Sequence, residues 1–316
     1  MKPIGTISFS IWSVCLLSLS GLFALSAVAQ QSDNSFRVET FPVGYIPEDL
    51  VSDGANIWVT NAGDNTVTKL RASDGVSLGD FPVGNNPRGI TFDGANIWVA
   101  NFDDNTLTKL RASDGALLGT FAAGSDPNDL AFDGTNIWTT NLFVDSVTKL
   151  RASDGVVLGT FPVGQLPWQI LFDGTSIWVT NRDQDSVTKL RVSDGTELAI
   201  VPVGNSPVGL AYDGANIWVT NIDSGTITVV RASDATVLRT ISFKGLVFPF
   251  YPAFDGRRMW VTDAGKEAVL LLRANDGAHA GRVKLTDFPY NIIWDGTSMW
   301  TVLELSDSVT KITLQR

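Results

Sequence analysis

Residues 53–61 have the sequence Asp-Gly-Ala-Asn-Ile-Trp-Val-Thr-Asn, and this stretch or a close variant of it occurs seven times along the chain. The tryptophans of successive copies are separated by 40, 40, 40, 40, 42 and 40 residues. They are Trp58, Trp98, Trp138, Trp178, Trp218, Trp260 and Trp300. A period of this length, repeated this often, is typical of proteins in which each copy forms one supersecondary unit.

Each repeat predicts four short β-strands. In the repeat 205–246, runs rich in β-branched and aromatic residues cover 210–212, 217–220, 226–231 and 237–243, and Asp, Asn, Gly or Ser residues separate them. Such runs and turns indicate antiparallel β-structure, and no segment sustains the 3.6-residue period of a helix. Four antiparallel strands per repeat is the pattern of a β-propeller blade, with a solenoid of stacked β-coils as the alternative.

The two ends of the repeat region favour a closed ring. Residues 36–44 match the fourth strand of a repeat, whereas residues 308–314 match a third strand. If these two strands pair, no end unit is left uncapped, as it would be in an open stack. We therefore predict an all-β, seven-bladed propeller with four antiparallel strands per blade, closed by the N-terminal strand in the last blade. The predicted blades one to seven are 45–84, 85–124, 125–164, 165–204, 205–246, 247–286, and 287–316 with 36–44.

Positions that stay constant between repeats are expected to serve the blade itself. The Asp-Gly pairs, of which Asp53-Gly54 is the first, suit turns that need a positive φ. The tryptophans are expected to pack between neighbouring blades. In the recurring segment KLRASDG, as at 69–75, we expect the lysine and the arginine to form a solvated rim with apolar stems.

The variable positions gather after seven prolines, each of which precedes an innermost strand. The next two residues differ from blade to blade, and both should surround the mouth of the central channel on one face. Blades one to three contribute charged and amide groups there, and blades four, six and seven contribute aromatic groups. The sequence thus predicts a pocket for a sugar, a peptide side chain or a similar ligand. Its candidate ligand-binding residues are Trp168, Phe250, Tyr251, Tyr290, Glu48, Arg88 and Asn128.

Two further departures from the repeat fall on the same face. The loop 244–251 is two residues longer than its counterparts and strongly apolar, so it is expected either to contact a partner or to cover the channel. The Trp strand ends in Asn in five blades, where the side chain is expected to cap its own turn. Asp263 and Glu304 depart from this pattern, and we expect both acids near the aromatic side of the pocket.

Catalytic chemistry has few candidates in this chain. His279 is the only histidine and is expected on a turn of the opposite face, so neither a Ser-His-Asp system nor a Cys/His zinc site is predicted. The acidic loops 103–105 and 183–185 lack a calcium-loop pattern. Oxygen ligands for Mg²⁺ or Ca²⁺ are conceivable only at the channel mouth. The candidate metal ligands there are Asp49, Asp129, Asn291 and Glu304.

The first 29 residues have the features of a secretory signal peptide. Lys2 supplies a positive charge, residues 11–25 are apolar, and residues 27–29 (Ala-Val-Ala) fit the cleavage pattern. A membrane anchor is the alternative, but the apolar run is short for a span. We expect cleavage after Ala29, a short leader at 30–35, one propeller domain at 36–316, no membrane insertion after cleavage, and a periplasmic or secreted protein.

Composition narrows the expected partners. Cys15 is the only cysteine, so the mature chain would use no disulfides and would depend on packing and ring closure. Loss of Lys2 would leave 22 basic and 33 acidic side chains, a net charge near −11. This balance disfavours nucleic acid and anionic membranes as partners. We expect a monomer that binds a protein or a small-molecule or sugar ligand.

The units IWVTN, DNTVTKL and GTFPVGxxPxxL resemble the YVTN-type β-propeller repeat of bacterial and archaeal surface and periplasmic proteins. The resemblance covers residues 36–316 and implies a seven-bladed propeller, an envelope location, and a binding or scaffolding role. The chain is more distantly similar to streptogramin (virginiamycin B) lyases, which implies magnesium and a catalytic His with nearby Glu residues. Here WVTN stands where that family has WFTE-like motifs.

Gluconolactonase-type propellers imply a metal held by Glu, Asn and Asp at the channel, and Glu48, Asn128 and Asp129 have that chemistry. From the residues and these resemblances together, we predict a non-enzymatic binding or scaffolding propeller without a cofactor. A metal-dependent lyase or lactonase using Mg²⁺ or Ca²⁺ is the alternative.

Overall fold

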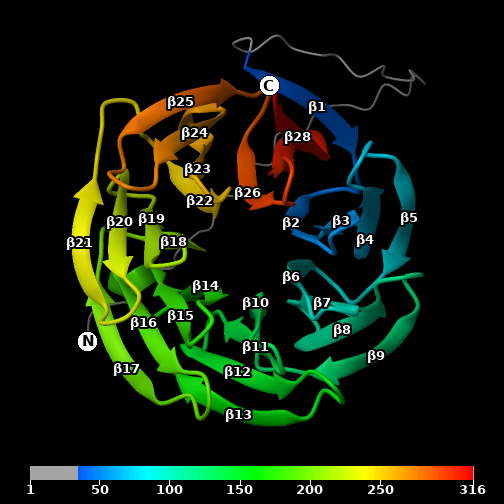
Figure 1. The fold of residues 1–316 in the computed structure, drawn as a ribbon. Coiled ribbons are helices and arrows are strands. Elements are labelled where there is room, and N and C mark those ends of the chain that lie inside the picture. Colours follow the sequence, from blue (N-terminus) through cyan, green and yellow to red (C-terminus); the bar gives the residue numbers. More distant parts are fainter. Residues whose placement is uncertain (1–34, 316) are drawn as a thin grey trace, which may run out of the picture.

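The computed structural model describes residues 35–315, which form a ring of seven four-stranded antiparallel sheets around a central channel (Figure 1). The predicted signal peptide and most of the leader lie outside the described residues. Apart from the strands, the structure has three short 3-10 turns, η1 (Arg182–Gln184), η2 (Ala264–Lys266) and η3 (Glu304–Ser306). Within the described range, no helix is long and apolar enough to cross a membrane. The predicted fold class is confirmed.

Each blade consists of consecutive strands that run from the channel outwards. Blades one and two comprise β2 (Pro47–Ser52), β3 (Asn56–Asn61), β4 (Thr66–Arg71), β5 (Ser77–Pro82), β6 (Pro87–Phe92), β7 (Asn96–Asn101), β8 (Thr106–Arg111) and β9 (Leu117–Ala122). Blades three and four comprise β10 (Pro127–Phe132), β11 (Asn136–Asn141), β12 (Ser146–Arg151), β13 (Val157–Pro162), β14 (Pro167–Phe172), β15 (Ser176–Asn181), β16 (Ser186–Arg191) and β17 (Glu197–Pro202). Blades five and six comprise β18 (Pro207–Tyr212), β19 (Asn216–Asn221), β20 (Thr226–Arg231), β21 (Thr236–Ile241), β22 (Pro249–Phe254), β23 (Arg258–Asp263), β24 (Ala268–Arg273) and β25 (His279–Lys284).

The seventh blade joins the two ends of the described chain. It contains β26 (Pro289–Trp294), β27 (Met299–Leu303) and β28 (Ser308–Leu314), and β1 (Phe36–Pro42) forms its outermost strand. β1 pairs with β28 in continuous antiparallel register from Phe36 opposite Leu314 to Pro42 opposite Ser308. The predicted closure of the ring is therefore confirmed.

The tryptophans fill the spaces between blades, as predicted. Trp58 is fully buried and belongs to a cluster with Ile90, Ile97 and Val99 of the next blade. Its indole N–H donates to the carboxylate of Asp53, at the Asp-Gly turn of its own blade, over 2.9 Å. Burial alone would raise the pKa of Asp53, but this bond and those from the Asn56 side chain and nearby main-chain amides hold that pKa below its usual range. The aspartate therefore orients the core tryptophan as well as forming the turn.

The lysines of the KLRASDG segments are buried, and the prediction of a solvated lysine rim is wrong. Lys69 is only 6% exposed, and its ammonium group donates to the carbonyl oxygen of Ala112 in the next blade over 2.7 Å. The same group lies 4.7 Å from the centroid of the Trp58 ring, within cation–π distance. Lys311 repeats this contact across the ring closure, with the carbonyl oxygen of Ala72. The lysines thus connect neighbouring blades.

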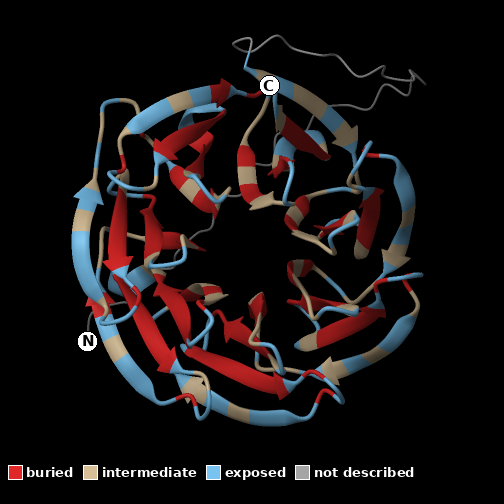
Figure 2. Cartoon of the chain, in the orientation of Figure 1, coloured by how far each residue is buried: buried red, intermediate tan, exposed pale blue. Residues whose placement is uncertain are grey.

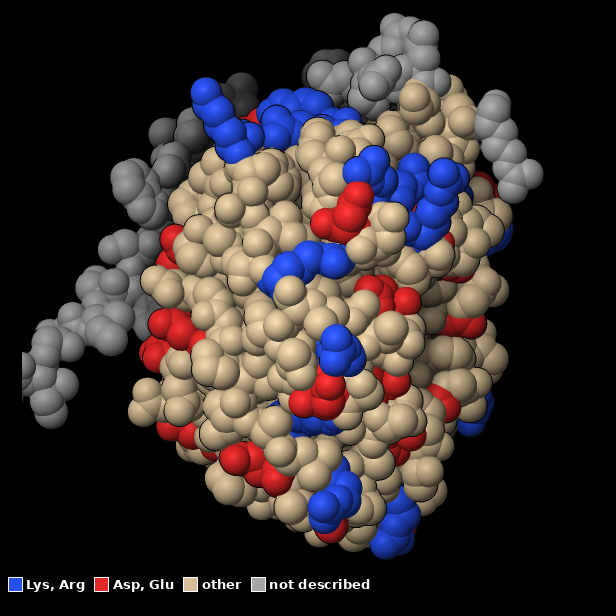
Figure 3. Space-filling view, turned by 60° about the vertical axis from the view of Figure 1, so that its left-hand side comes forward, with Lys and Arg blue, Asp and Glu red and all other residues tan. Residues whose placement is uncertain are grey.

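The arginines of the same segments do form an exposed rim. Arg71 is about half exposed and pairs with Asp74 in its own turn. Figure 2 shows the general pattern, in which the middle strands of each blade are buried and the outermost strands are largely exposed. Basic side chains also gather over blade six (Figure 3), where Arg258 and Arg273 pair with Asp255 and Asp276 of the adjacent turns.

Replacing the inter-blade lysine should destabilise the fold much more than replacing the neighbouring arginine. Lys149→Met removes an ammonium group that donates to the carbonyl oxygens of Val192 and Ser193. Hydrogen bonds to charged groups contribute about 1.5–3 kcal/mol, so a loss of that size in the free energy of unfolding is expected from urea titration. Arg151→Met, in the same strand, is the matched control and should change it by less than about 1 kcal/mol. Equal effects would contradict the inter-blade role.

Candidate ligand-binding site

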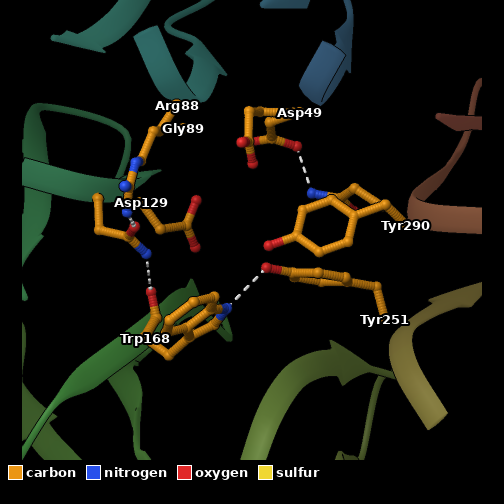
Figure 4. A pocket seen from close by; sticks show the side chains of 10 residues that line it. Asp49, Arg88, Gly89, Asp129, Trp168, Tyr251 and Tyr290 are labelled. Atoms are coloured by element: carbon orange, nitrogen blue, oxygen red, sulfur yellow. Dashed lines mark hydrogen bonds between the residues drawn. The ribbon is translucent and has the colours of Figure 1, made fainter. Parts of the chain in front are cut away.

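The innermost strands of the seven blades begin at the seven prolines and line the channel. At the mouth of the channel, on the face that carries the loops before these prolines, lies a cavity of about 140 Å³ (Figure 4). Its walls are formed by Glu48, Asp49, Arg88, Gly89, Asn128, Asp129, Trp168, Tyr251, Tyr290 and Asn291. Every one of these residues is the first or second after a proline, so the cavity lies where the repeats differ.

The structure brings most of the predicted site residues to this cavity. Of the candidate ligand-binding residues, all except Phe250 line it. The Phe250 ring instead packs against Phe288 and Tyr290, with centroid distances of 5.5 and 5.3 Å. Of the candidate metal ligands, Glu304 does not line the cavity and lies on η3. Gly89 lines it, as expected for a second residue after a proline, but it was not among the candidate binding residues because glycine has no side chain to bind a ligand.

Three aromatic side chains form one wall of the cavity. The indole N–H of Trp168 donates to the hydroxyl of Tyr251 over 2.9 Å. The rings of Tyr251 and Tyr290 meet edge to face, 5.2 Å between centroids. Figure 4 shows these rings facing the acidic residues Asp49 and Asp129 across the cavity. The hydrogen bond and the ring contacts hold the wall in one arrangement, which suits a binding surface.

A chain of hydrogen bonds holds the polar wall. The guanidinium group of Arg88 donates to the amide oxygen of Asn128 over 2.9 Å, and the Asn128 amide donates to the main-chain oxygen of Trp168 over 2.8 Å. Arg88 also lies over the ring of Phe102, 3.5 Å from its centroid. The arginine is therefore fixed against its own wall rather than extended into the cavity.

The second residue after the proline often connects neighbouring innermost strands. A carboxylate oxygen of Asp49 accepts the main-chain N–H of Ile90 over 3.0 Å, and Asp129 accepts that of Ile170 over 2.9 Å. Gln169 makes the same type of bond to the next blade, and Asn291 donates to Asp49. At Gly89 the neighbouring strand comes so close that a Cβ atom would lie 2.6 Å from the Cα of Asp129. These acids and amides therefore support the channel wall as well as lining the cavity.

The acids of the cavity hold protons more strongly than usual. Burial and the nearby carboxylate of Glu304 raise the pKa of Glu48 to about 7, although Arg88 acts in the opposite direction. Burial and the charge of Asp129 raise the pKa of Asp49 well above its usual range. Burial likewise raises the pKa of Asp129, against hydrogen bonds from two main-chain amides. Near neutral pH the cavity is therefore acidic but not fully ionised.

The donor set fits a metal ion poorly. Among residues 35–315, no three His, Cys, Asp or Glu side chains lie close enough together to share one. Asp49 and Asp129, the best placed acids, already accept main-chain N–H groups. His279 begins the outermost strand of blade six, where its exposed side chain packs against Phe243. No step through Mg²⁺ or Ca²⁺ follows from this arrangement.

The long loop 244–251 is bonded to the Trp strand of its own blade, and its last residue, Tyr251, lines the cavity. The main-chain N–H groups of Val247 and Phe248 donate to Asp263, which is fully buried in the Trp strand and does not line the cavity. Asp263, which was expected near the aromatic side of the pocket, thus binds the loop and is not part of the cavity wall. Within the same loop, the side chain of Phe248 is 45% exposed.

In five other blades an asparagine occupies the position of Asp263. Asn61, for example, accepts the N–H of Gly44 and donates to the hydroxyls of two threonines, so it does more than cap its own turn.

Beyond the cavity the channel continues as a wider bore of about 430 Å³. Its walls include Leu50, Ile170, Leu210 and Trp294 of the innermost strands. Asp49, Asp129 and Asn291 line both spaces and mark the boundary between them. The cavity is thus a small chamber at the end of the wider channel.

Comparisons with known proteins support the fold. No protein-family profile and no curated protein sequence matches the chain. A streptogramin B lyase structure superposes with a TM-score of 0.77 at 20% identity, over 90% of this chain and 100% of that one. Virginiamycin B lyase from Staphylococcus aureus gives 0.77 at 18%, over 89% and 100%, and U3-55K gives 0.78 at 14%, over 89% and 99%. Because identities this low show the fold alone, the chain is a β-propeller of the shape that these proteins share.

Proposed function

We propose that the protein is a non-enzymatic binding module whose site is the cavity at the channel mouth. The observation that carries the proposal is a cavity of about 140 Å³ in which a rigid aromatic wall faces the carboxyl groups of Asp49 and Asp129 (Figure 4). Cavities that combine apolar surface with a few fixed polar groups are typical of small-ligand sites. The ligand group in this site is a sugar ring, a peptide side chain or another group of similar size.

A binding role also agrees with the rest of the molecule. The resemblance of the repeats to the YVTN type supports a binding or scaffolding function, and the N-terminal segment supports a place in the periplasm or outside the cell. The donor set fits a metal poorly and His279 lies on the outermost strand of blade six, so neither feature supports the alternative of a lyase or lactonase. We therefore carry no enzymatic function forward.

Thermal unfolding in the presence of single monosaccharides and free amino acids tests the proposal. A compound that binds only the native state raises its stability, by about 2.7 kcal/mol when it is present at 100 times its Kd. At least one probe is expected to raise the unfolding temperature of the wild type and to lose this effect in the double variant Trp168→Ala, Tyr290→Ala. Phe143→Ala, which changes an exposed aromatic residue on the same face, is the matched control.

The double variant is expected to fold, because the seven core tryptophans and the ring closure are untouched. If it unfolds, these residues belong to the core and the site is misassigned. Trp168→Phe keeps most of the packing and provides a second, milder test of the same wall. A probe that stabilises the wild type and the double variant equally would show that binding occurs elsewhere.

A further inference from the structure

We propose that the cavity binds a primary alkylammonium group, such as the end of a lysine side chain. The inference rests on the proposed binding function and specifies the chemistry of its ligand. It follows from three features of the cavity: the balance of charges, the aromatic wall, and an acid that has no partner of its own.

The charges around the cavity favour a cation. Three carboxyl groups line it, those of Glu48, Asp49 and Asp129, against the single guanidinium group of Arg88. Arg88 is held by Asn128 and Phe102 and is therefore directed to its own wall. A positively charged group entering the cavity meets more negative than positive charge, and an anion meets the reverse.

The aromatic wall favours the same charge. The face of an aromatic ring carries partial negative charge and attracts ammonium groups, most strongly when water is excluded. Trp168, Tyr251 and Tyr290 supply such rings opposite the acids (Figure 4). A cation between the two walls is thus attracted from both sides, whereas a neutral group gains only from packing.

Glu48 supplies the acceptor that the ligand would use. Among the described residues, no side chain or main-chain group donates a hydrogen bond to its carboxylate, unlike those of Asp49 and Asp129. Burial and the nearby carboxylate of Glu304 raise the pKa of Glu48 to about 7, because both disfavour its negative charge. A bound ammonium group would offset that charge. An ammonium group has three N–H donors and can bond to more than one of these acids.

The size of the cavity selects a side-chain-sized group. A cavity of about 150 Å³ accommodates a molecule the size of benzene, and this one measures about 140 Å³. Around it, the loops of the same face expose Tyr45, Phe248 and Leu305, which are 57%, 45% and 74% exposed. These residues offer apolar contacts to whatever carries the ammonium group. A lysine in a peptide and a free alkylamine share the required chemistry.

Binding of matched probes to the full-length protein, followed through the indole N–H resonance of Trp168, tests the inference. Trp168→Phe assigns this resonance. The ammonium probes are n-butylammonium and the blocked tripeptide acetyl-glycyl-lysyl-glycinamide; 1-butanol and the same tripeptide with norleucine are their uncharged counterparts. Both ammonium probes are expected to shift the resonance at about pH 8 and to bind several-fold more weakly at about pH 5, where the acids are protonated. Tighter binding of the tripeptide would identify a polypeptide as the carrier; tighter binding of butylammonium would identify a small amine.

Glu48→Gln separates charge from shape. It should weaken binding of both ammonium probes about tenfold or more, because it removes a charged acceptor while keeping the side-chain size. Glu197→Gln, on an exposed outermost strand, makes the same charge change far from the cavity and should leave binding unchanged. The inference is overturned if the uncharged probes bind as well as the ammonium probes, or if Glu48→Gln has no effect. In either case a shift of the Trp168 resonance by any probe preserves the binding function, whereas its insensitivity to every probe overturns both.

Discussion

A disulfide between β1 and β28, introduced as Thr40→Cys with Thr310→Cys, is expected to raise the free energy of unfolding by up to about 5.6 kcal/mol. The hydroxyl oxygens of these two threonines are 3.1 Å apart across the closing strand pair, and the residues lie 270 positions apart in sequence. The stabilisation is large because the cross-link removes the freedom of a very long loop from the unfolded chain. The comparison is between oxidised and reduced protein in guanidinium titrations.

A threonine pair inside a blade provides the matched control. The hydroxyls of Thr148 and Thr160 lie 3.2 Å apart on neighbouring strands of blade three, but only 12 positions separate them. The same cross-link there should add about 2.8 kcal/mol, roughly half as much. Equal stabilisation by the two disulfides would contradict the prediction. It would mean that the length of the cross-linked loop does not determine the effect, and that the ring opens at another place before β1 separates from β28.

The fold was predictable from the sequence because the repeat averages out local ambiguity. One copy of DGANIWVTN indicates little more than a turn and a strand, but seven copies at a fixed period restrict the chain to a few architectures. The strand of residues 36–42 then settled how the ring closes, since β28 pairs with β27 on one edge and only β1 covers its other edge. The role of the lysines was not predictable in the same way. Lys69 and an exposed lysine look alike in sequence, and only the position of the next blade shows that its ammonium group reaches a carbonyl oxygen there.

The composition of the cavity was also largely predictable, but its internal geometry was not. The positions after the prolines vary between blades and share a face, so Trp168 and Glu48 could be assigned to one cavity. Whether a side chain at such a position points into the cavity depends on its neighbours. Phe250 packs instead on Phe288, and Asp49 bonds to the main chain of the next blade. These outcomes arise from contacts between blades, which the spacing of residues within one blade does not reveal.

In blades five and six the inter-blade lysine is replaced by Val229 and Leu271. Blade five compensates through Arg239, which donates to the carbonyl oxygen of Ala274 and lies over the Trp218 ring. In blade six, Phe36 of the closing strand packs edge to face on Trp260. The repeat therefore tolerates several solutions to one contact, as long as the tryptophan stays covered. The variable residues after the prolines differ from these substitutions. They leave an open cavity and, within residues 35–315, the carboxylate of Glu48 without a hydrogen-bond donor.

The second large effect expected concerns Glu48: Glu48→Gln should stabilise the protein at about pH 8 by on the order of 1–3 kcal/mol. The pKa of Glu48 is about 7 in the folded protein against 4.5 for an unperturbed glutamate. The folded state therefore binds the proton more tightly than the unfolded state does. The stability contributed by the protonated form is fully present below about pH 4.5 and is lost as the pH rises through about 7. Glutamine resembles the protonated acid at every pH and avoids this loss.

Urea titrations of the wild type and the variant at about pH 5 and about pH 8 measure the difference. The two proteins should be similar in stability at the lower pH, and the variant should be the more stable at the higher one. Asp49 and Asp129, whose pKa values are also raised, keep part of the pH dependence in the variant. Asp53 and Asp93, at two of the Asp-Gly turns, have lowered pKa values and act only at more acidic pH. A variant less stable than the wild type at about pH 8 would mean that the Glu48 carboxylate has a stabilising partner in the free protein, and the ammonium group would then have no vacant acceptor to occupy.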